Sequence, residues 1–205
     1  MSNKELSNFT HSCSEPQLCI TEYRAPLSDL YSPDELSEIV RFYVLQAPIA
    51  KTSNGTTKKE SNLRNLSALG WSGNGKLNSL ERKLLNNSSI SSFNMVAYSS
   101  LTKLLKDINL SDEICPVHPR ALVQRPAKLT LNEDGTISRN YSDSNRMQCL
   151  FRHLRNGIAH SQTYLFPNAG TLLIEDHDAN HNITARLLLK KQTLLDWIQI
   201  VEATN

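Results

Sequence analysis

The segment from Ser144 to His160 constrains the fold more than any other stretch, because it can bury one face as an amphipathic helix. At about 100° per residue, its large apolar side chains fall on a single side. These side chains are Met147, Leu150, Phe151, Leu154 and Ile158. A chain of 205 residues can cover such a face with its own core. We therefore expect one domain built around this helix.

Further helices are predicted before and after this segment. Ser32 and Pro33, followed by two acidic residues, are a typical helix start, and apolar residues recur at helical spacing up to residue 46. Helical periodicity also predicts helices over residues 63–71, 77–85, 91–108 and 194–201.

Two β-hairpins are predicted within this helical pattern. Residues 129–131 and 136–138 flank a turn that contains Asp134-Gly135, and residues 171–174 and 183–189 flank a polar stretch. The rest of 109–143 is unassigned. We expect a mainly α fold, a helical bundle with one or two β-hairpin insertions. Residues 1–30 would form an irregular N-terminal arm, and residues 31–205 a single helical domain.

Charge and composition narrow the function and the compartment. The 22 basic and 20 acidic residues give a net charge of +2, so any nucleic-acid contact must come from local clustering. No run of 18 apolar residues predicts a membrane span, and the N-terminus lacks a secretory signal. None of Cys13, Cys19, Cys115 and Cys149 forms a CxxC pair. We expect a cytoplasmic protein with reduced thiols.

The polar face of helix 144–160 carries groups that handle protons and phosphates. Arg152, Asn156 and His160 follow one another every four residues, with Arg155 at the flank. Histidine can move protons at neutral pH, and arginine can stabilise phosphate charge. Without a metal, this set suits RNA cleavage through the ribose 2′-OH, which leaves a 2′,3′-cyclic phosphate and a 5′-OH. The alternative is an ordinary surface arginine and histidine.

Two neighbouring residues have structural explanations. Gly157 in a helix interior costs about 1 kcal/mol relative to alanine, which predicts close approach by another backbone, such as that of a second subunit. His153 points away from the polar face and is interpreted as a partly buried helix residue.

The stretch 155–160, RNGIAH, resembles the RNxxxH motif of the HEPN superfamily (higher eukaryotes and prokaryotes nucleotide-binding). The apolar residue before it fits, as does the downstream order of a hairpin and a final helix. This order resembles plasmid- and phage-defence-associated bacterial HEPN proteins. The resemblance covers about residues 144–203.

The resemblance implies a HEPN-like helical domain and a metal-independent endoribonuclease. Arg155 and His160 would be the catalytic pair, supported by Asn156, and Arg152 is a candidate RNA contact, with a solvent-facing arginine as the alternative. HEPN domains are usually homodimers whose motifs face each other, and many act in toxin–antitoxin or phage-defence systems. A regulatory or antitoxin-like partner is therefore possible, and a catalytically silent RNA-binding or dimerisation module is the alternative function.

A second candidate site lies in the polar stretch between the last two predicted strands. Histidines and carboxylates there suit a divalent metal. They are Glu175, Asp176, His177, Asp178 and His181. Because solvated polar residues are ordinary at a hairpin tip, we favour that interpretation and expect no metal and no cofactor.

Overall fold

A mixed five-stranded sheet is the centre of the computed structural model, which describes residues 18–19, 26–50, 62–90, 92–97, 101–107, 113–143 and 145–203. The strands in spatial order are β2 (Ser92–Ala97), β4 (Arg120–Arg125), β9 (Ile183–Lys190), β8 (Thr171–His177) and β7 (Thr163–Phe166). β2 and β4 are parallel, and the other neighbours are antiparallel.

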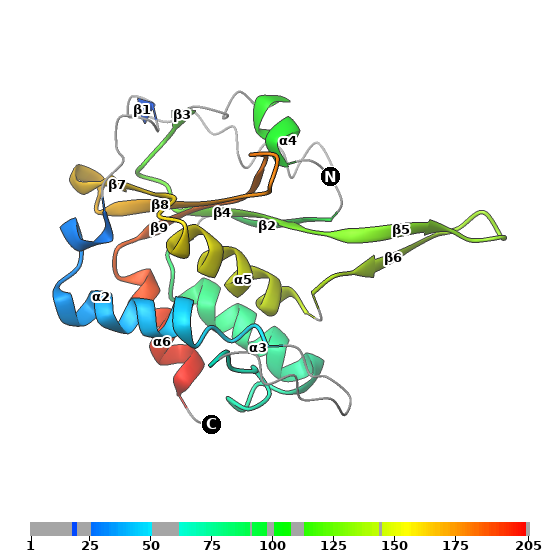
Figure 1. Cartoon of the computed structure of the whole chain (residues 1–205), viewed down its shortest axis with the longest axis horizontal. Coiled ribbons are helices and arrows are strands. Elements are labelled where there is room, and N and C mark those ends of the chain that lie inside the picture. Colours follow the sequence, from blue (N-terminus) through cyan, green and yellow to red (C-terminus); the bar gives the residue numbers. More distant parts are fainter. Residues whose placement is uncertain are drawn as a thin grey trace.

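Most helices lie on one face of this sheet (Figure 1). They are α2 (Pro33–Ile39) with its π-helical continuation η3 (Val40–Leu45), α3 (Gly73–Asn86), α5 (Arg146–Ala159) and α6 (Thr193–Glu202). The other face carries α4 (Leu101–Asp107) and a small sheet of β1 (Leu18–Cys19) and β3 (Glu113–Ile114). Short 3₁₀ turns, η2 (Leu27–Asp29) and η4 (Pro167–Ala169), complete the elements.

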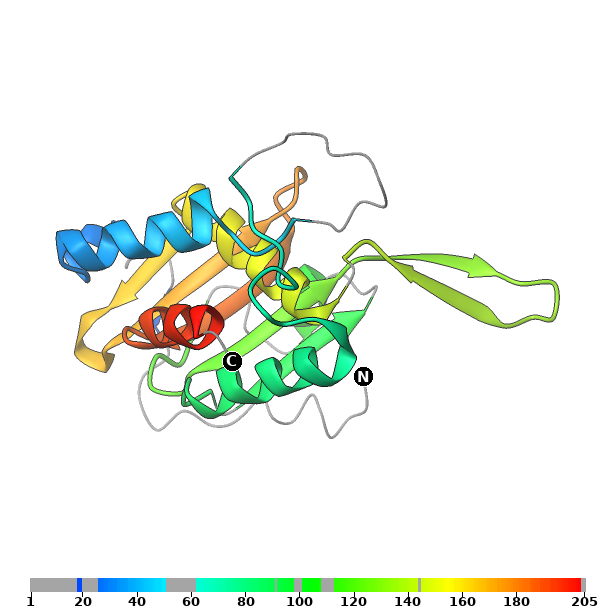
Figure 2. The same cartoon turned by 90° about the horizontal axis from the view of Figure 1, so that it is seen from below.

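A two-stranded ribbon of β5 (Ala127–Leu131) and β6 (Ile137–Tyr141) leaves the body between β4 and α5. Figures 1 and 2, which differ by a quarter turn, both show it projecting well beyond the sheet and helices. We call this ribbon the arm. It confirms the first predicted hairpin and makes it longer than expected.

The expectation of a mainly α, HEPN-like helical bundle is wrong, because a five-stranded mixed sheet organises the fold. The predicted helix 91–108 is divided into β2 and α4, and the predicted helix 63–71 forms turns. In β2, Phe93 and Met95 pack towards the main core while Val96 packs on the opposite face, an alternation that suits a strand. Its partner β4 lies in the segment left unassigned.

Other predicted elements are confirmed, namely α2, α3, α5, α6 and the β8–β9 hairpin. The helix start at Ser32 forms a capping box with Glu35, in which each side chain accepts a hydrogen bond from the other residue's backbone N–H. Residues 1–30 were expected to form an irregular N-terminal segment. The structure describes 18–19 and 26–30 of it, and the remainder lies outside the described residues.

Two buried indoles join α6 to α3 and to the segment that precedes α3. Trp71 donates to the carbonyl of Val201 at 2.9 Å, and Trp197 donates to the carbonyl of Leu84 at 2.9 Å. Both rings are buried in the main core, so each aromatic body is packed while its N–H is satisfied. These two hydrogen bonds hold α6 against α3 and against the segment that precedes α3.

The cysteines differ from the expectation of reduced thiols. Cys115 is disulfide-bonded, whereas Cys149 is a free, buried thiol. Disulfides are uncommon in cytosolic proteins, so the cysteines do not support a cytoplasmic location. Within the described part of the chain, no helix has the length and apolar character needed to span a membrane.

Gly157 lies where α5 crosses β8, and this contact corrects the expectation that a second subunit explains the glycine. A Cβ added there would lie 2.5 Å from the Glu175 carbonyl oxygen and 2.5 Å from the Cγ2 of Ile174. The close backbone is therefore a strand of the same chain, and any larger side chain would push α5 away from the sheet.

We expect Gly157→Ala to destabilise the protein by about 1–3 kcal/mol, because a backbone carbonyl cannot move aside as a flexible side chain can. Urea unfolding measures the change. The matched control is Gly75→Ala in α3, where an added Cβ meets nothing within 4 Å. This control adds helix propensity and should not lower stability. Equal effects of the two substitutions would contradict the close packing of α5 on β8.

Candidate functional site

His160 lies at the C-terminal end of α5, where backbone hydrogen bonds fix the course of the chain. The residue is the C-cap of α5, and the next residue, Ser161, has φ 54°. Gln162 N–H donates to the Gly157 carbonyl at 2.8 Å, and Ser161 N–H donates to the Ile158 carbonyl at 3.1 Å. This pair of bonds is the Schellman arrangement, which usually has glycine at the left-handed position. His160 is exposed at this fixed end.

The three arginines of α5 differ in their partners. Arg146 pairs with Glu81 at 2.9 Å, and the guanidinium of Arg152 binds both carboxylate oxygens of Asp143 at 3.0 Å. Arg155 makes no ion pair or hydrogen bond with any described residue, and its Nε is buried without a partner. Its positive charge is therefore the one on this helix that the described chain does not neutralise.

A network of polar side chains lies between α5 and the sheet. The Asn156 amide donates to Asp176 Oδ2 at 3.3 Å, and His153 Nδ1 lies 2.6 Å from the same oxygen. Asp176 is buried in β8 and His153 is 0% exposed, so this carboxylate has little solvent to stabilise it. Both contacts hold the last two turns of α5 on the strand.

The second ring nitrogen of His153 reaches β4. Nε2 lies 2.8 Å from the Gln124 carbonyl and 3.1 Å from Arg152 Nη2. In the neutral ring with Nδ1–H donating to Asp176, Nε2 accepts from Arg152; a proton on both nitrogens would direct Nε2–H at Gln124. The imidazole thus lies between α5, β8 and β4, within 3.1 Å of a polar atom on each. His153 is thus fully buried, as part of the structural interior.

The Asp143 carboxylate fixes the position of the Arg152 guanidinium. Burial raises the pKa of Asp143, but the hydrogen bonds and charge of Arg152 outweigh it, so the pKa lies below its ordinary value. An ionised Asp143 thus accounts for the position of Arg152 without RNA. Next to this pair, burial and the charge of Asp143 raise the pKa of the Cys149 thiol to about 12, which makes it unsuitable as a nucleophile.

The second candidate site is not a solvated hairpin tip. Glu175 and Asp176 are buried within β8, and the exposed turn begins after His177. On the face away from Asp176, Glu175 accepts from Arg186 Nε at 2.6 Å and lies 3.2 Å from His177 Nε2. Across the residues that the structure describes, no group of three or more His, Cys, Asp or Glu could hold a metal ion.

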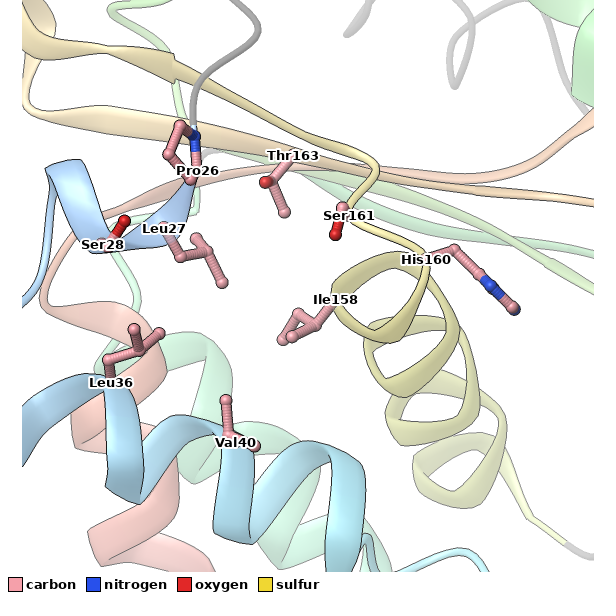
Figure 3. A pocket seen from close by; sticks show the side chains of 9 residues that line it. All are labelled: Pro26, Leu27, Ser28, Leu36, Val40, Ile158, His160, Ser161 and Thr163. Atoms are coloured by element: carbon pink, nitrogen blue, oxygen red, sulfur yellow. The ribbon is translucent and has the colours of Figure 1, made fainter. Parts of the chain in front are cut away.

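A pocket of about 630 Å³ adjoins the helix end (Figure 3). The side chains of Leu27, Leu36, Val40 and Ile158 point into it, whereas the His160 imidazole extends away from its centre. An apolar lining does not suit a phosphate. His160 therefore faces solvent beside the pocket instead of lining a preformed anion site.

The structure brings some of the predicted site residues together and leaves others apart. Asn156 and Arg152 join the buried network, while no hydrogen bond between Arg155 and His160 is found in the described chain. Sequence reasoning missed Asp176 as the partner of His153 and Asn156. Its alternation with Ile174, which faces α5, could have placed it on the same side of β8.

Comparison with known proteins adds no family. Scans against protein-family models, curated proteins and solved structures found no match to this chain. Its fold and site define a mixed α/β protein with an unpaired arginine and an exposed histidine near one helix end.

We expect Asp176→Ala to lower the free energy of unfolding by about 3 kcal/mol, because His153 and Asn156 both lose their acceptor in a buried site. Urea unfolding measures this loss. Asp29→Ala, at an exposed acid in η2, should change stability by less than about 0.5 kcal/mol. A loss at Asp176 no larger than that of the control would exclude a structural role for the network.

The acid stability of the protein should depend on Glu175. Burial raises its pKa, but the His177 hydrogen bond and the charge of Arg186 outweigh this, and the net pKa is below the usual 4.5. The unfolded chain then binds the proton more readily than the folded chain. The contribution of Glu175 to the free energy of unfolding is therefore fully present above about pH 4.5 and is lost as the pH falls below that value. In Glu175→Gln, unfolding free energy should fall less between neutral pH and pH 3. Parallel curves for the two proteins would refute this linkage.

Proposed function

We propose that the protein is a metal-independent endoribonuclease that acts through Arg155 and His160. The observation that carries the proposal is the contrast along α5. Arg146 and Arg152 are paired with acids, while Arg155 has no acidic partner in the described chain, and His160 is exposed a few residues later. An unneutralised guanidinium and an accessible imidazole near the same helix end suit an external phosphodiester.

The proposed reaction uses the ribose as its own nucleophile. His160 accepts the 2′-OH proton, the 2′ oxygen forms a bond to phosphorus, and the bond from phosphorus to the 5′ oxygen breaks. The 5′ oxygen leaves with a proton from water, and the ends are a 2′,3′-cyclic phosphate and a 5′-OH. Arg155 stabilises the charge on the phosphoryl oxygens, and Asn156 positions this turn of α5 through Asp176.

The partners follow from this reaction. RNA is the proposed substrate and a homodimer the proposed assembly, and an antitoxin-like or other regulatory partner in a toxin–antitoxin or phage-defence setting belongs to the same proposal. RNA as the substrate favours a cytoplasmic site of action, although the Cys115 disulfide is unusual there.

A catalytically silent RNA-binding module is the second candidate. It is favoured because no hydrogen bond joins Arg155 and His160 in the described chain, whereas cleavage requires both groups to reach one phosphate. In this case Arg155 would contribute binding alone.

Cleavage assays on the full chain distinguish these functions. End-labelled single-stranded RNA in EDTA should be cut to products with cyclic phosphate ends, while DNA stays intact because it lacks the 2′-OH. Arg155→Ala and His160→Ala should each lower the rate by about 100-fold or more. The controls are Arg82→Ala and His118→Ala at exposed positions, which should leave the rate unchanged.

Two results would reject the enzyme. The first is cleavage that needs Mg²⁺ or that persists in both site variants. The second is intact RNA whose binding is lost in Arg155→Ala alone, which would support the silent RNA-binding module.

A further inference from the structure

The pocket beside His160 is suited to a small neutral group. Its volume of about 630 Å³ lies within the roughly 300–1,000 Å³ that is typical of small-molecule sites. Leu27, Leu36, Val40 and Ile158 point into it (Figure 3). Among the described residues, no lysine, arginine, aspartate or glutamate lines it, and the His160 imidazole extends away from its centre. A charged group inside would therefore have no counter-charge from this lining.

One buried hydroxyl in the lining has no partner. Thr163, the first residue of β7, borders the pocket and is 3% exposed. Its backbone pairs with Ile174 of β8, whereas its hydroxyl makes no hydrogen bond in the described chain. Buried polar groups are nearly always hydrogen-bonded, because an unpaired one costs free energy. The hydroxyl can therefore bind a polar atom that enters the pocket.

A second hydroxyl lies between this threonine and His160. Ser161 borders the pocket and has φ 54°, a left-handed conformation that glycine adopts at lower cost. Serine at this position places a hydroxyl where glycine would have none. Figure 3 shows Ser161 and Thr163 along the same side of the pocket, across from Leu36 and Val40. The polar groups are thus gathered on the side of the pocket that leads to His160.

This combination of side chains restricts the ligand. A wholly apolar ligand would leave the Thr163 hydroxyl unpaired, and a charged one would be buried without a counter-charge. A nucleobase avoids both costs, since its ring faces pack on apolar side chains and its edge carries neutral donors and acceptors. Proteins that take up a single base enclose it between such side chains and bind its edge. A threonine hydroxyl can donate or accept there.

We propose that this pocket binds one base of the RNA, with the base edge hydrogen-bonded to the Thr163 hydroxyl. The inference rests on RNA as the proposed substrate. His160 and Ser161 are consecutive and both border the pocket, so the ribose of the bound nucleotide leads from the pocket towards the imidazole. Its phosphate stays outside the apolar lining, on the side of His160. The substrate is single-stranded, because a paired and stacked base is not free to enter.

A titration of the full chain with free ribonucleosides, followed by NMR, tests the base site. Nucleosides are uncharged and contain no phosphodiester, so their binding is measured whether or not the protein cleaves RNA. We expect saturable shifts of the methyl signals of Leu27, Leu36, Val40 and Ile158, with a dissociation constant on the order of 1 mM. Free ribose is the control and should shift none of them.

Thr163→Val removes the hydroxyl and keeps the branched shape. It should raise the nucleoside dissociation constant by about threefold or more. The urea midpoint should not fall, because the hydroxyl has no partner to lose. The matched control is Thr171→Val, at a buried hydroxyl that donates to the Pro116 carbonyl at 2.9 Å. This control should lower the urea midpoint and leave the nucleoside affinity within about twofold.

The outcomes separate this inference from the proposed cleavage. Pocket methyl signals that do not move with any ribonucleoside, or that move equally with ribose, would overturn the base site even if RNA is cut. Unchanged nucleoside affinity in Thr163→Val would do the same. Nucleosides that shift these signals while RNA stays intact would support the base site and reject the endoribonuclease.

Discussion

The close packing of α5 on β8 is the contact on which the polar network of the protein depends. Gly157 lets the helix backbone come down onto the carbonyl of Glu175, and that approach brings His153 and Asn156 within reach of Asp176. A larger residue at position 157 would push α5 away from β8. The buried Asp176 carboxylate would then lose His153 and Asn156 as hydrogen-bond partners. Close packing and the satisfaction of a buried acid are thus a single geometric condition.

This condition divides the polar residues of α5 into two groups. Arg152, His153 and Asn156 face Asp143 and Asp176 and are occupied within the protein, where they fix the helix. Arg155 and His160 have no such partners among the described residues. A helix anchored by the first group can hold the second group in place near its end, as a site for an external anion requires.

The helices and hairpins were largely predictable from the sequence, because caps, periodicity and turn residues are local signals. α2 begins at its predicted capping serine, and the turn at Asp134-Gly135 closes the arm. The parallel pair of β2 and β4 was not predictable in this way, since its strands are joined through α4 and β3 and recognise each other across the fold. Missing these strands turned a mixed α/β fold into a predicted helical bundle.

By itself, the sequence determined the amphipathic character of α5 and the order of polar groups along it, because a helix repeats every 3.6 residues. It also determined that an interior glycine needs a close neighbour. Tertiary structure decided that this neighbour is β8, that His153 is buried against Asp176, and that Arg152 is taken by Asp143. Partners from distant segments set these outcomes, and local periodicity contains no information about them.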